Sequence, residues 1–197
     1  MQSTFSTSST LAQPARPLAT SLPGRAAIVL GATLFVAVCA HISIPLPFTP
    51  VPLTLQNFAV LLVGLLLGPA AGFAAMALYL AEGAMGLPVF NPGGPGGILQ
   101  LLGPTGGYLL SYPLIAATAG WVFRSVPLKS LYIRAALAGT LATVILFAAG
   151  SLWMAQLLHL SSSAVWTMTL APFLPGEIVK IAAAAGLAAS IQSWRRA

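Results

Sequence analysis

Long apolar segments follow one another through most of this chain, with short connections between them. Each of six such segments is close to the roughly 20 residues that a helix needs to cross a bilayer. They cover residues 26–44, 53–67, 73–87, 104–123, 131–158 and 172–191. The chain is 58% hydrophobic and only 5% charged, whereas soluble domains carry about 25% charged residues. We therefore predict an all-α integral membrane protein, in which residues 26–192 form a bundle of six transmembrane helices.

The two ends of the chain differ from this apolar middle. Residues 1–24 contain mainly Ser, Thr, Pro and Leu, with one Arg and no acidic residue. They lack the continuous apolar core of a secretory signal. We expect residues 1–25 to form a disordered cytoplasmic tail, with a transit peptide as the alternative. Residues 193–197 would then form a short basic end in the cytoplasm.

The basic residues predict how the bundle is oriented. If the amino terminus is cytoplasmic, seven of the eight basic residues lie in or beside cytoplasmic connections, in agreement with the positive-inside rule. These seven are Arg16, Arg25, Arg124, Lys129, Arg134, Arg195 and Arg196. We expect a multi-pass protein of the cell membrane with both termini in the cytoplasm. The basic residues form no stripe interleaved with aromatic residues, so we expect no nucleic-acid partner.

The eighth basic residue, Lys180, lies inside a hydrophobic segment, three residues after Glu177. Charged side chains in lipid are costly, and they usually face a protein interior or a water-filled cavity that handles substrate. The Lys180 ammonium has three donors, which suit a ligand carboxylate or the Glu177 carboxylate itself. We predict that both residues line a binding site at the outer face. The alternative is an ion pair that only packs the bundle.

Other polar residues near the outer ends of the segments are further candidates for this site. Gln56 can both donate and accept hydrogen bonds and could contact a ligand. The alternative is that this stretch only starts a helix, which Thr54 and Asn57 cap. Tyr108 and Tyr112 each offer an apolar face with a polar tip, which also suits an anchor at the membrane interface. Glu82 is the only other acidic residue of the chain, and we expect it to contact either the ligand or a partner within the bundle.

The chain lacks the constellations that catalysis requires. No Gly-rich loop ends in Gly-Lys-Ser/Thr to hold a nucleotide, and no Gly-x-Ser-x-Gly elbow presents a nucleophile. Two His and two Glu residues, spread over four segments, do not form a metal-ligand spacing. We therefore expect a binding protein with no cofactor and no metal. A membrane-embedded enzyme is the less favoured alternative.

Four stretches stand in a specific order along the chain. They are residues 42–56 (ISIPLPFTPVPLTLQ), 79–90 (YLAEGAMGLPVF), 102–108 (LGPTGGY) and 172–180 (PFLPGEIVK). Together they resemble the BioY family, the substrate-binding components of biotin transporters of the energy-coupling factor type. The resemblance implies a six-helix subunit that captures biotin from the outer face with high affinity. A subunit or facilitator for another small carboxylate or vitamin is the alternative.

The resemblance also implies partners for this chain. A transmembrane coupling protein and two ATPase subunits would supply the energy for transport, although some members of the family work without a dedicated module. Ala27 and Gly31, four residues apart on the first segment, would belong to the face that docks on the coupling protein. Packing within the bundle is the alternative for this spacing, because small residues let helices approach closely in lipid.

The family pattern Pro-Gly-Asp-x-x-Lys on the last helix matches Pro175, Gly176 and Lys180, with Glu177 in place of the Asp. The loop between the third and fourth segments usually contributes an Asn to the ligand, and Asn91 is the candidate in this chain. Biotin has a carboxylate, an apolar chain and a ureido ring, which require one cation, an apolar slot and neutral donors and acceptors. The resemblance implies that Lys180, Gln56, Asn91 and Tyr108 supply the polar groups.

Overall fold

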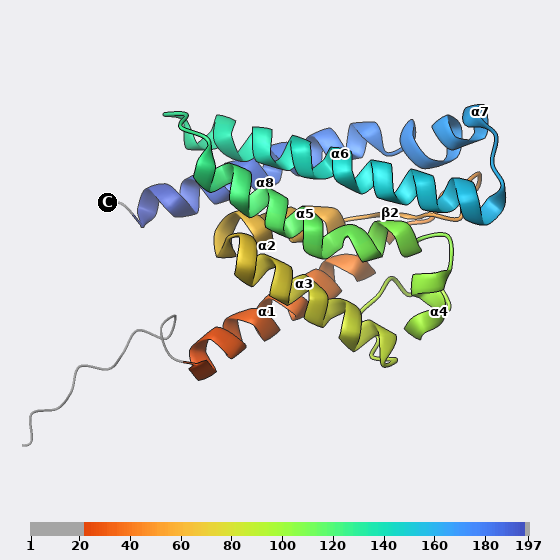
Figure 1. Cartoon of the computed structure of the whole chain (residues 1–197), viewed down its shortest axis with the longest axis horizontal. Helices are drawn as coiled ribbons and strands as arrows, with labels where there is room; N and C mark the ends of the chain where they lie inside the picture. Colours follow the sequence, from red (N-terminus) through yellow and green to blue (C-terminus); the bar gives the residue numbers. More distant parts are fainter. Residues whose placement is uncertain (1–21, 196–197) are drawn as a thin grey trace, which may run out of the picture.

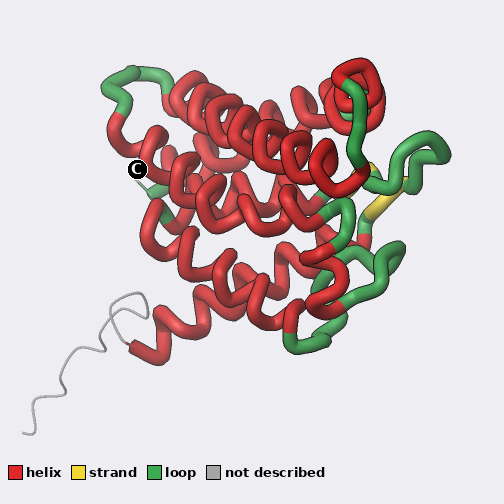
Figure 2. Tube along the Cα trace, turned by 45° about the vertical axis from the view of Figure 1, so that its right-hand side comes forward, coloured by secondary structure: helices red, strands yellow, loops and turns green. Residues whose placement is uncertain are grey.

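The protein is mostly helical in the computed structural model, which describes residues 22–195 (Figures 1 and 2). The long helices are α1 (Leu22–His41), α2 (Gln56–Leu67), α3 (Pro69–Ala84), α5 (Gly106–Ser125), α6 (Leu131–Leu158) and α8 (Leu174–Trp194). Shorter elements are α4 (Gly97–Leu102), α7 (Ser162–Val165) and the π-helix η2 (Trp166–Leu170). Strand β1 (Ser43–Ile44) pairs antiparallel with β2 (Leu53–Thr54). One long helix thus corresponds to each predicted apolar segment.

The boundaries of some predicted segments change. The turn predicted at residues 68–72 reduces to Gly68, whose φ of 85° favours glycine, and α3 begins directly at Pro69. The connection predicted at residues 88–103 contains α4, and the connection at 159–171 contains α7 and η2. Residues 22–25, predicted as the end of the tail, belong to α1. Residues 1–21, 196 and 197 lie outside the described part of the chain.

Within residues 22–195, three helices, α1, α6 and α8, are long and apolar enough to cross a membrane, whereas α2 is apolar but has only 12 residues. Large apolar side chains also point outward from several helices, including Leu34, Trp121, Val144 and Leu152. Exposed apolar surface of this extent is typical of a membrane contact. These features indicate a membrane protein.

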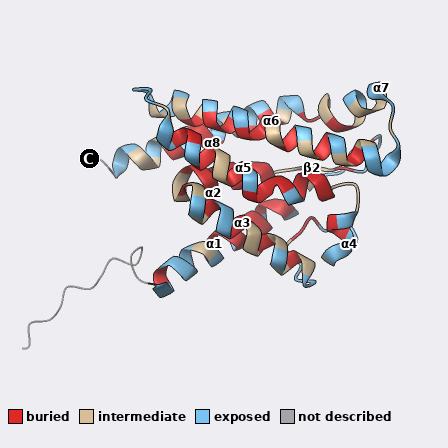
Figure 3. Cartoon of the chain, viewed as in Figure 1, coloured by how far each residue is buried: buried red, intermediate tan, exposed pale blue. Residues whose placement is uncertain are grey.

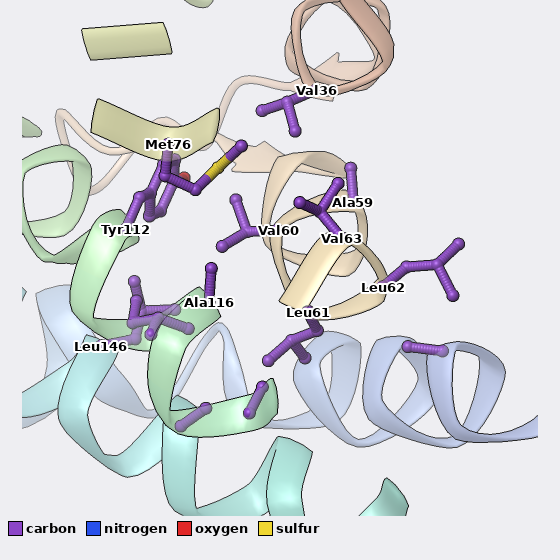
Figure 4. Close-up of a cluster of buried hydrophobic side chains, with 14 of the residues drawn as sticks. Val36, Ala59, Val60, Leu61, Leu62, Val63, Met76, Tyr112, Ala116 and Leu146 are labelled. Atoms are coloured by element: carbon purple, nitrogen blue, oxygen red, sulfur yellow. The ribbon is translucent and has the colours of Figure 1, made fainter. Parts of the chain in front are cut away.

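The centre of the bundle is built where α2, α3 and α5 approach one another closely. A Cβ atom added to Gly64 would lie 2.4 Å from the backbone oxygen of Ala116, and one added to Gly120 would lie 2.6 Å from the oxygen of Gly64. Gly72 also faces this crossing. Small residues thus allow the three backbones to touch, as in other membrane helices. Val60 and Leu61 of α2 pack around the crossing, on the buried inner faces of the helices (Figures 3 and 4).

The bundle has two different ends (Figure 1). One end, which we call the loop end, carries the β1–β2 hairpin, α4 and α7. The opposite end, the basic end, carries the α5–α6 connection and the carboxyl terminus. There Arg124 Nη2 donates to the backbone oxygen of Leu67 at 2.9 Å. Arg134 Nε donates to the backbone oxygen of Phe123 at 3.0 Å, and its guanidinium lies 5.0 Å from the centre of the Phe123 ring. Both arginines thus cap the carboxyl ends of helices.

Candidate binding site

A pocket opens among the first turns of α2, α5 and α8 at the loop end. Its polar lining comprises Thr54, Gln56, Asn57, Asn91, Gln100, Thr105, Tyr108, Tyr112, Glu177 and Lys180. Its apolar lining comprises Val51, Pro52, Leu109, Leu146, Phe147 and Phe173. Five of the six residues predicted for the ligand site, all except Glu82, therefore come together from separate parts of the chain.

Glu177 and Lys180 form the charged centre of the pocket. Because they are three residues apart on α8, their side chains lie on one helix face, and Lys180 Nζ is 2.5 Å from Glu177 Oε1. Asn57 Nδ2 donates to the second carboxylate oxygen, Glu177 Oε2, also at 2.5 Å. Glu177 lies in the first turn of α8, where the helix dipole favours a negative charge. Both carboxylate oxygens thus have partners, while the Lys180 ammonium keeps donors for a ligand.

Gln56 is held by a short chain of hydrogen bonds. Its Nε2 donates to Tyr79 Oη at 2.8 Å, and Tyr79 Oη donates to the backbone oxygen of Val89 at 2.7 Å. The backbone nitrogen of Gln56 donates to Thr54 Oγ1 at 3.3 Å, so Thr54 stabilises the start of α2. The side-chain oxygen of Gln56 has no hydrogen-bond donor among residues 22–195 and can accept from a ligand.

Asn91 lines the pocket, but its side chain also fixes the loop that carries it. Asn91 Nδ2 donates to the backbone oxygen of Ala40 at 3.0 Å, and Oδ1 accepts from the backbone nitrogen of Gly93 at 2.8 Å. Gln100 holds the same loop, because its Nε2 donates to the backbone oxygen of Asn91 at 3.3 Å. These contacts tie the loop after α3 to the end of α1, beside the pocket.

Tyr108 presents its ring to the pocket and uses its hydroxyl elsewhere. The hydroxyl donates to the backbone oxygen of Thr169 at 3.0 Å, within the π-helix η2. The ring lies against Gly150, where an added Cβ would be 2.2 Å from the ring. Ser151 Oγ and Thr169 Oγ1 are 2.7 Å apart and reinforce the contact between α6 and η2. Tyr108 therefore joins α5 to α6 and η2 at the pocket wall.

Three other predicted residues lie away from the pocket. Glu82 is half-buried between α1 and α3, and its Oε1 lies 3.2 Å from Thr33 Oγ1. Of the two contacts expected for Glu82, a ligand or a partner within the bundle, the structure shows the second. Ala27 and Gly31 are exposed on α1, and a Cβ added to Gly31 would meet nothing within 4 Å. They face outward, whereas Ala37 on the same helix packs inside.

Sequence reasoning missed several residues of the lining. Asn57 was assigned only to helix capping, yet its side chain reaches Glu177 on α8. Gln100 and Thr105 also line the pocket and were not predicted. Tyr112, which was considered together with Tyr108, is 4% exposed, and its hydroxyl has no hydrogen-bond partner within the described part of the chain. No group of His, Cys, Asp and Glu in residues 22–195 could hold a metal ion.

The chain is similar to known proteins over most of its length. A protein of Pyrococcus horikoshii named as a probable biotin transporter BioY is 38% identical over 162 residues, which cover 81% of this chain and 92% of the relative. The biotin transporter BioY of Rhodobacter capsulatus is 34% identical over 177 residues, which cover 85% and 92% of the two chains. In Thermotoga maritima, a biotin transporter BioY is 37% identical over 156 residues, which cover 79% and 88%.

The fold is also similar to a solved structure, the S-component for biotin from an ECF-type ABC transporter. The TM-score is 0.78 at 22% sequence identity, and the match covers 88% of this chain and 95% of the other. The two proteins therefore share a fold. The sequence model of the BioY family matches residues 10–197. The chain belongs to the BioY family.

Proposed function

We propose that this chain is the high-affinity biotin-binding subunit of a vitamin transporter and captures biotin from the outer face of the cell membrane for uptake. The observation that carries the proposal is the buried Lys180–Glu177 pair in a pocket with apolar walls, in a chain of the BioY family. The subunit recognises its ligand and catalyses no reaction, and biotin is its cargo rather than a cofactor.

The chemistry of the pocket suits each part of biotin. Lys180 offers a positive charge with free donors, while Leu146 and Phe147 contribute to an apolar slot. Gln56, Asn91 and Tyr108 add neutral polar groups around it. A few well-placed polar groups in a mostly apolar cavity are what a site for a small molecule requires. Glu82 lies outside this set and has a role within the bundle.

We expect the pocket to widen when biotin enters. Its volume is about 60 Å³, whereas pockets for small molecules typically measure roughly 300–1,000 Å³. The connections that border the pocket, at residues 45–52 and 88–103, are rich in Pro and Gly. We expect these connections to move outward when biotin enters and to cover it afterwards.

In the membrane, residues 26–192 form the binding domain and all six long helices cross the bilayer. The basic end faces the cytoplasm with both termini, and the loop end faces outward. Support for this orientation comes from the charges. The connections at residues 45–52, 88–103 and 159–171 contain no Lys, Arg, Asp or Glu, whereas Arg124, Lys129 and Arg134 gather at the basic end, as the positive-inside rule requires. The two ends of the chain, before α1 and after α8, then lie on the cytoplasmic side.

Transport requires partners that supply energy. We infer a transmembrane coupling protein and two ATPase subunits of an energy-coupling factor module, which some family members can dispense with. The exposed small residues Ala27 and Gly31 on α1 offer a face on which a helix of the coupling protein can pack closely.

A site for another small carboxylate or vitamin is the second candidate function, because Lys180 alone would accept any carboxylate. Competition distinguishes the two. Labelled biotin should bind the purified protein and be displaced by unlabelled biotin, while other carboxylate vitamins at the same concentration should leave it bound. Displacement by another vitamin at lower concentration than biotin would reassign the ligand.

A further inference from the structure

Asn57 leaves one strong hydrogen-bonding atom unused inside the pocket wall. Its side chain is 3% exposed, and its Nδ2 donates to Glu177 Oε2. An ionised carboxylate only accepts hydrogen bonds, so the amide nitrogen must face Glu177 and the amide oxygen must face away from it. This oxygen, Asn57 Oδ1, is shielded from solvent and has no donor within the described residues.

An unpaired buried carbonyl is unfavourable, and native proteins rarely keep one without a reason. In residues 22–195, Thr143 Oγ1 is the one other side-chain oxygen or nitrogen that is fully shielded from solvent and without a partner. Thr143 lies on α6 and does not line the pocket, whereas Asn57 does. The position of Asn57 in the pocket lining therefore offers an explanation that Thr143 lacks, namely a ligand that completes its hydrogen bonds.

The charges and donors around Asn57 define the kind of group that fits. Glu177 already accepts from Lys180 and Asn57, so neither of its oxygens needs a ligand donor. Lys180 can only donate to a ligand, and the free group of Asn57 can only accept. The ligand part that lies against Asn57 must therefore bring an N–H or O–H group.

We propose that Asn57 is a specificity-determining residue whose Oδ1 accepts a hydrogen bond from an N–H of the ligand, while its Nδ2 holds Glu177. The proposal rests on the proposed function, because the ureido ring of biotin supplies N–H groups of this kind. The pair forms when the ligand widens the pocket and reaches the amide oxygen. Ligands that lack the N–H leave Asn57 Oδ1 unpaired and bind more weakly.

Glu177 links the other two polar groups of this arrangement. One of its carboxylate oxygens contacts Lys180 on the same helix, and the other accepts from Asn57 on α2. Asn57 and Glu177 thus act together, and Asn57 both orients the ion pair and presents the acceptor.

The test compares six dissociation constants for the purified full chain. They are measured for wild type and Asn57→Ala, each with biotin and with analogues methylated on either ureido nitrogen. In wild type, methylation of the nitrogen that faces Asn57 should weaken binding by at least about fivefold, the effect of leaving a buried acceptor unpaired. In Asn57→Ala, which lacks the acceptor and leaves room for the methyl group, the same methylation should weaken binding by less than about twofold.

Thr143→Ala is the matched control, because it also removes an unpartnered buried oxygen but lies outside the pocket. Its biotin affinity should stay within about twofold of wild type. If Asn57→Ala fails to fold, Asn57→Cys is the second variant; its thiol is only a weak acceptor, so it should give the same pattern.

Equal methylation penalties in wild type and in the Asn57 variant would overturn the proposal. Wild-type protein that binds both methylated analogues as tightly as biotin would also overturn it, and this measurement needs no variant. Either result, with biotin still bound tightly by wild type, would leave the proposed function intact. A folded wild type that does not bind biotin would remove the proposed function and this proposal together.

Discussion

The basic end and the loop end of this bundle use positive charge in different ways. At the basic end, Arg124 and Arg134 donate to backbone oxygens at the carboxyl ends of α2 and α5, and so they complete the helices. At the loop end, Lys180 is buried beside Glu177, in the wall of a pocket. A cation that caps a helix needs only carbonyl oxygens, whereas a buried cation needs an anion. We infer that the arginines stabilise the helices, and we propose that the lysine serves recognition.

The largest expected effect tests whether the Lys180–Glu177 pair serves recognition or only packs the bundle. Glu177→Met leaves Lys180 buried without its anion and should lower the free energy of unfolding by about 3–5 kcal/mol. The double variant Glu177→Met with Lys180→Met replaces the pair by apolar side chains of similar size, and its stability should return close to that of wild type. Thermal unfolding in detergent measures both effects.

The double variant also separates packing from recognition. If the pair serves recognition, the stable double variant should not bind biotin in a titration. A double variant that binds biotin as tightly as wild type would show that the pair has a packing role only.

Removal of Lys180 alone should affect binding more than any change at the basic end. Lys180→Ala should lower biotin affinity by at least about tenfold, or 1.4 kcal/mol, because the ligand loses its cation. Size-exclusion chromatography checks that the variant is still folded. Lys129→Ala is the matched control, since Lys129 is exposed in the α5–α6 connection and makes no hydrogen bond or ion pair within residues 22–195. An unchanged affinity in Lys180→Ala would remove this residue from the site.

At the basic end we expect a smaller effect, which lowers stability and leaves biotin affinity unchanged. Arg134→Ala removes the hydrogen bonds to the backbone oxygen of Phe123 and the stacking on its ring. The free energy of unfolding should fall by about 1–2 kcal/mol, because the carboxyl end of α5 loses its cation. Biotin affinity of the folded fraction should stay unchanged. A loss of affinity without a loss of stability would contradict the division between the two ends.

The helices could be predicted from the sequence because a bilayer requires long apolar segments, and these stand out in hydropathy alone. The segment predicted at 131–158 coincides with α6. The elements inside the connections were not predicted, because distant contacts stabilise them. Trp153 Nε1 donates to the backbone oxygen of Gly103, just after α4, and Tyr108 donates to the backbone oxygen of Thr169 in η2. Local composition does not contain this information.

The site was predictable where a residue is rare and not where it is ordinary. Lys180 stood out as the one basic residue that lies away from the predicted cytoplasmic connections, and its spacing from Glu177 predicted their contact. Asn57 was missed because an Asn near a helix start has a sufficient local explanation as a cap. Its contact with Glu177 joins residues that are 120 positions apart. Glu82 was equally rare, but its position between α1 and α3 depends on the packing of the bundle.

The central claim is that this chain alone forms a complete binding site for biotin. It is tested most directly by titrating biotin into the purified protein, without any coupling protein or ATPase, and measuring the heat of binding. The claim predicts saturable binding of one biotin per chain, with a dissociation constant in the nanomolar to micromolar range. A folded, monodisperse protein that shows no saturable binding of biotin would contradict it.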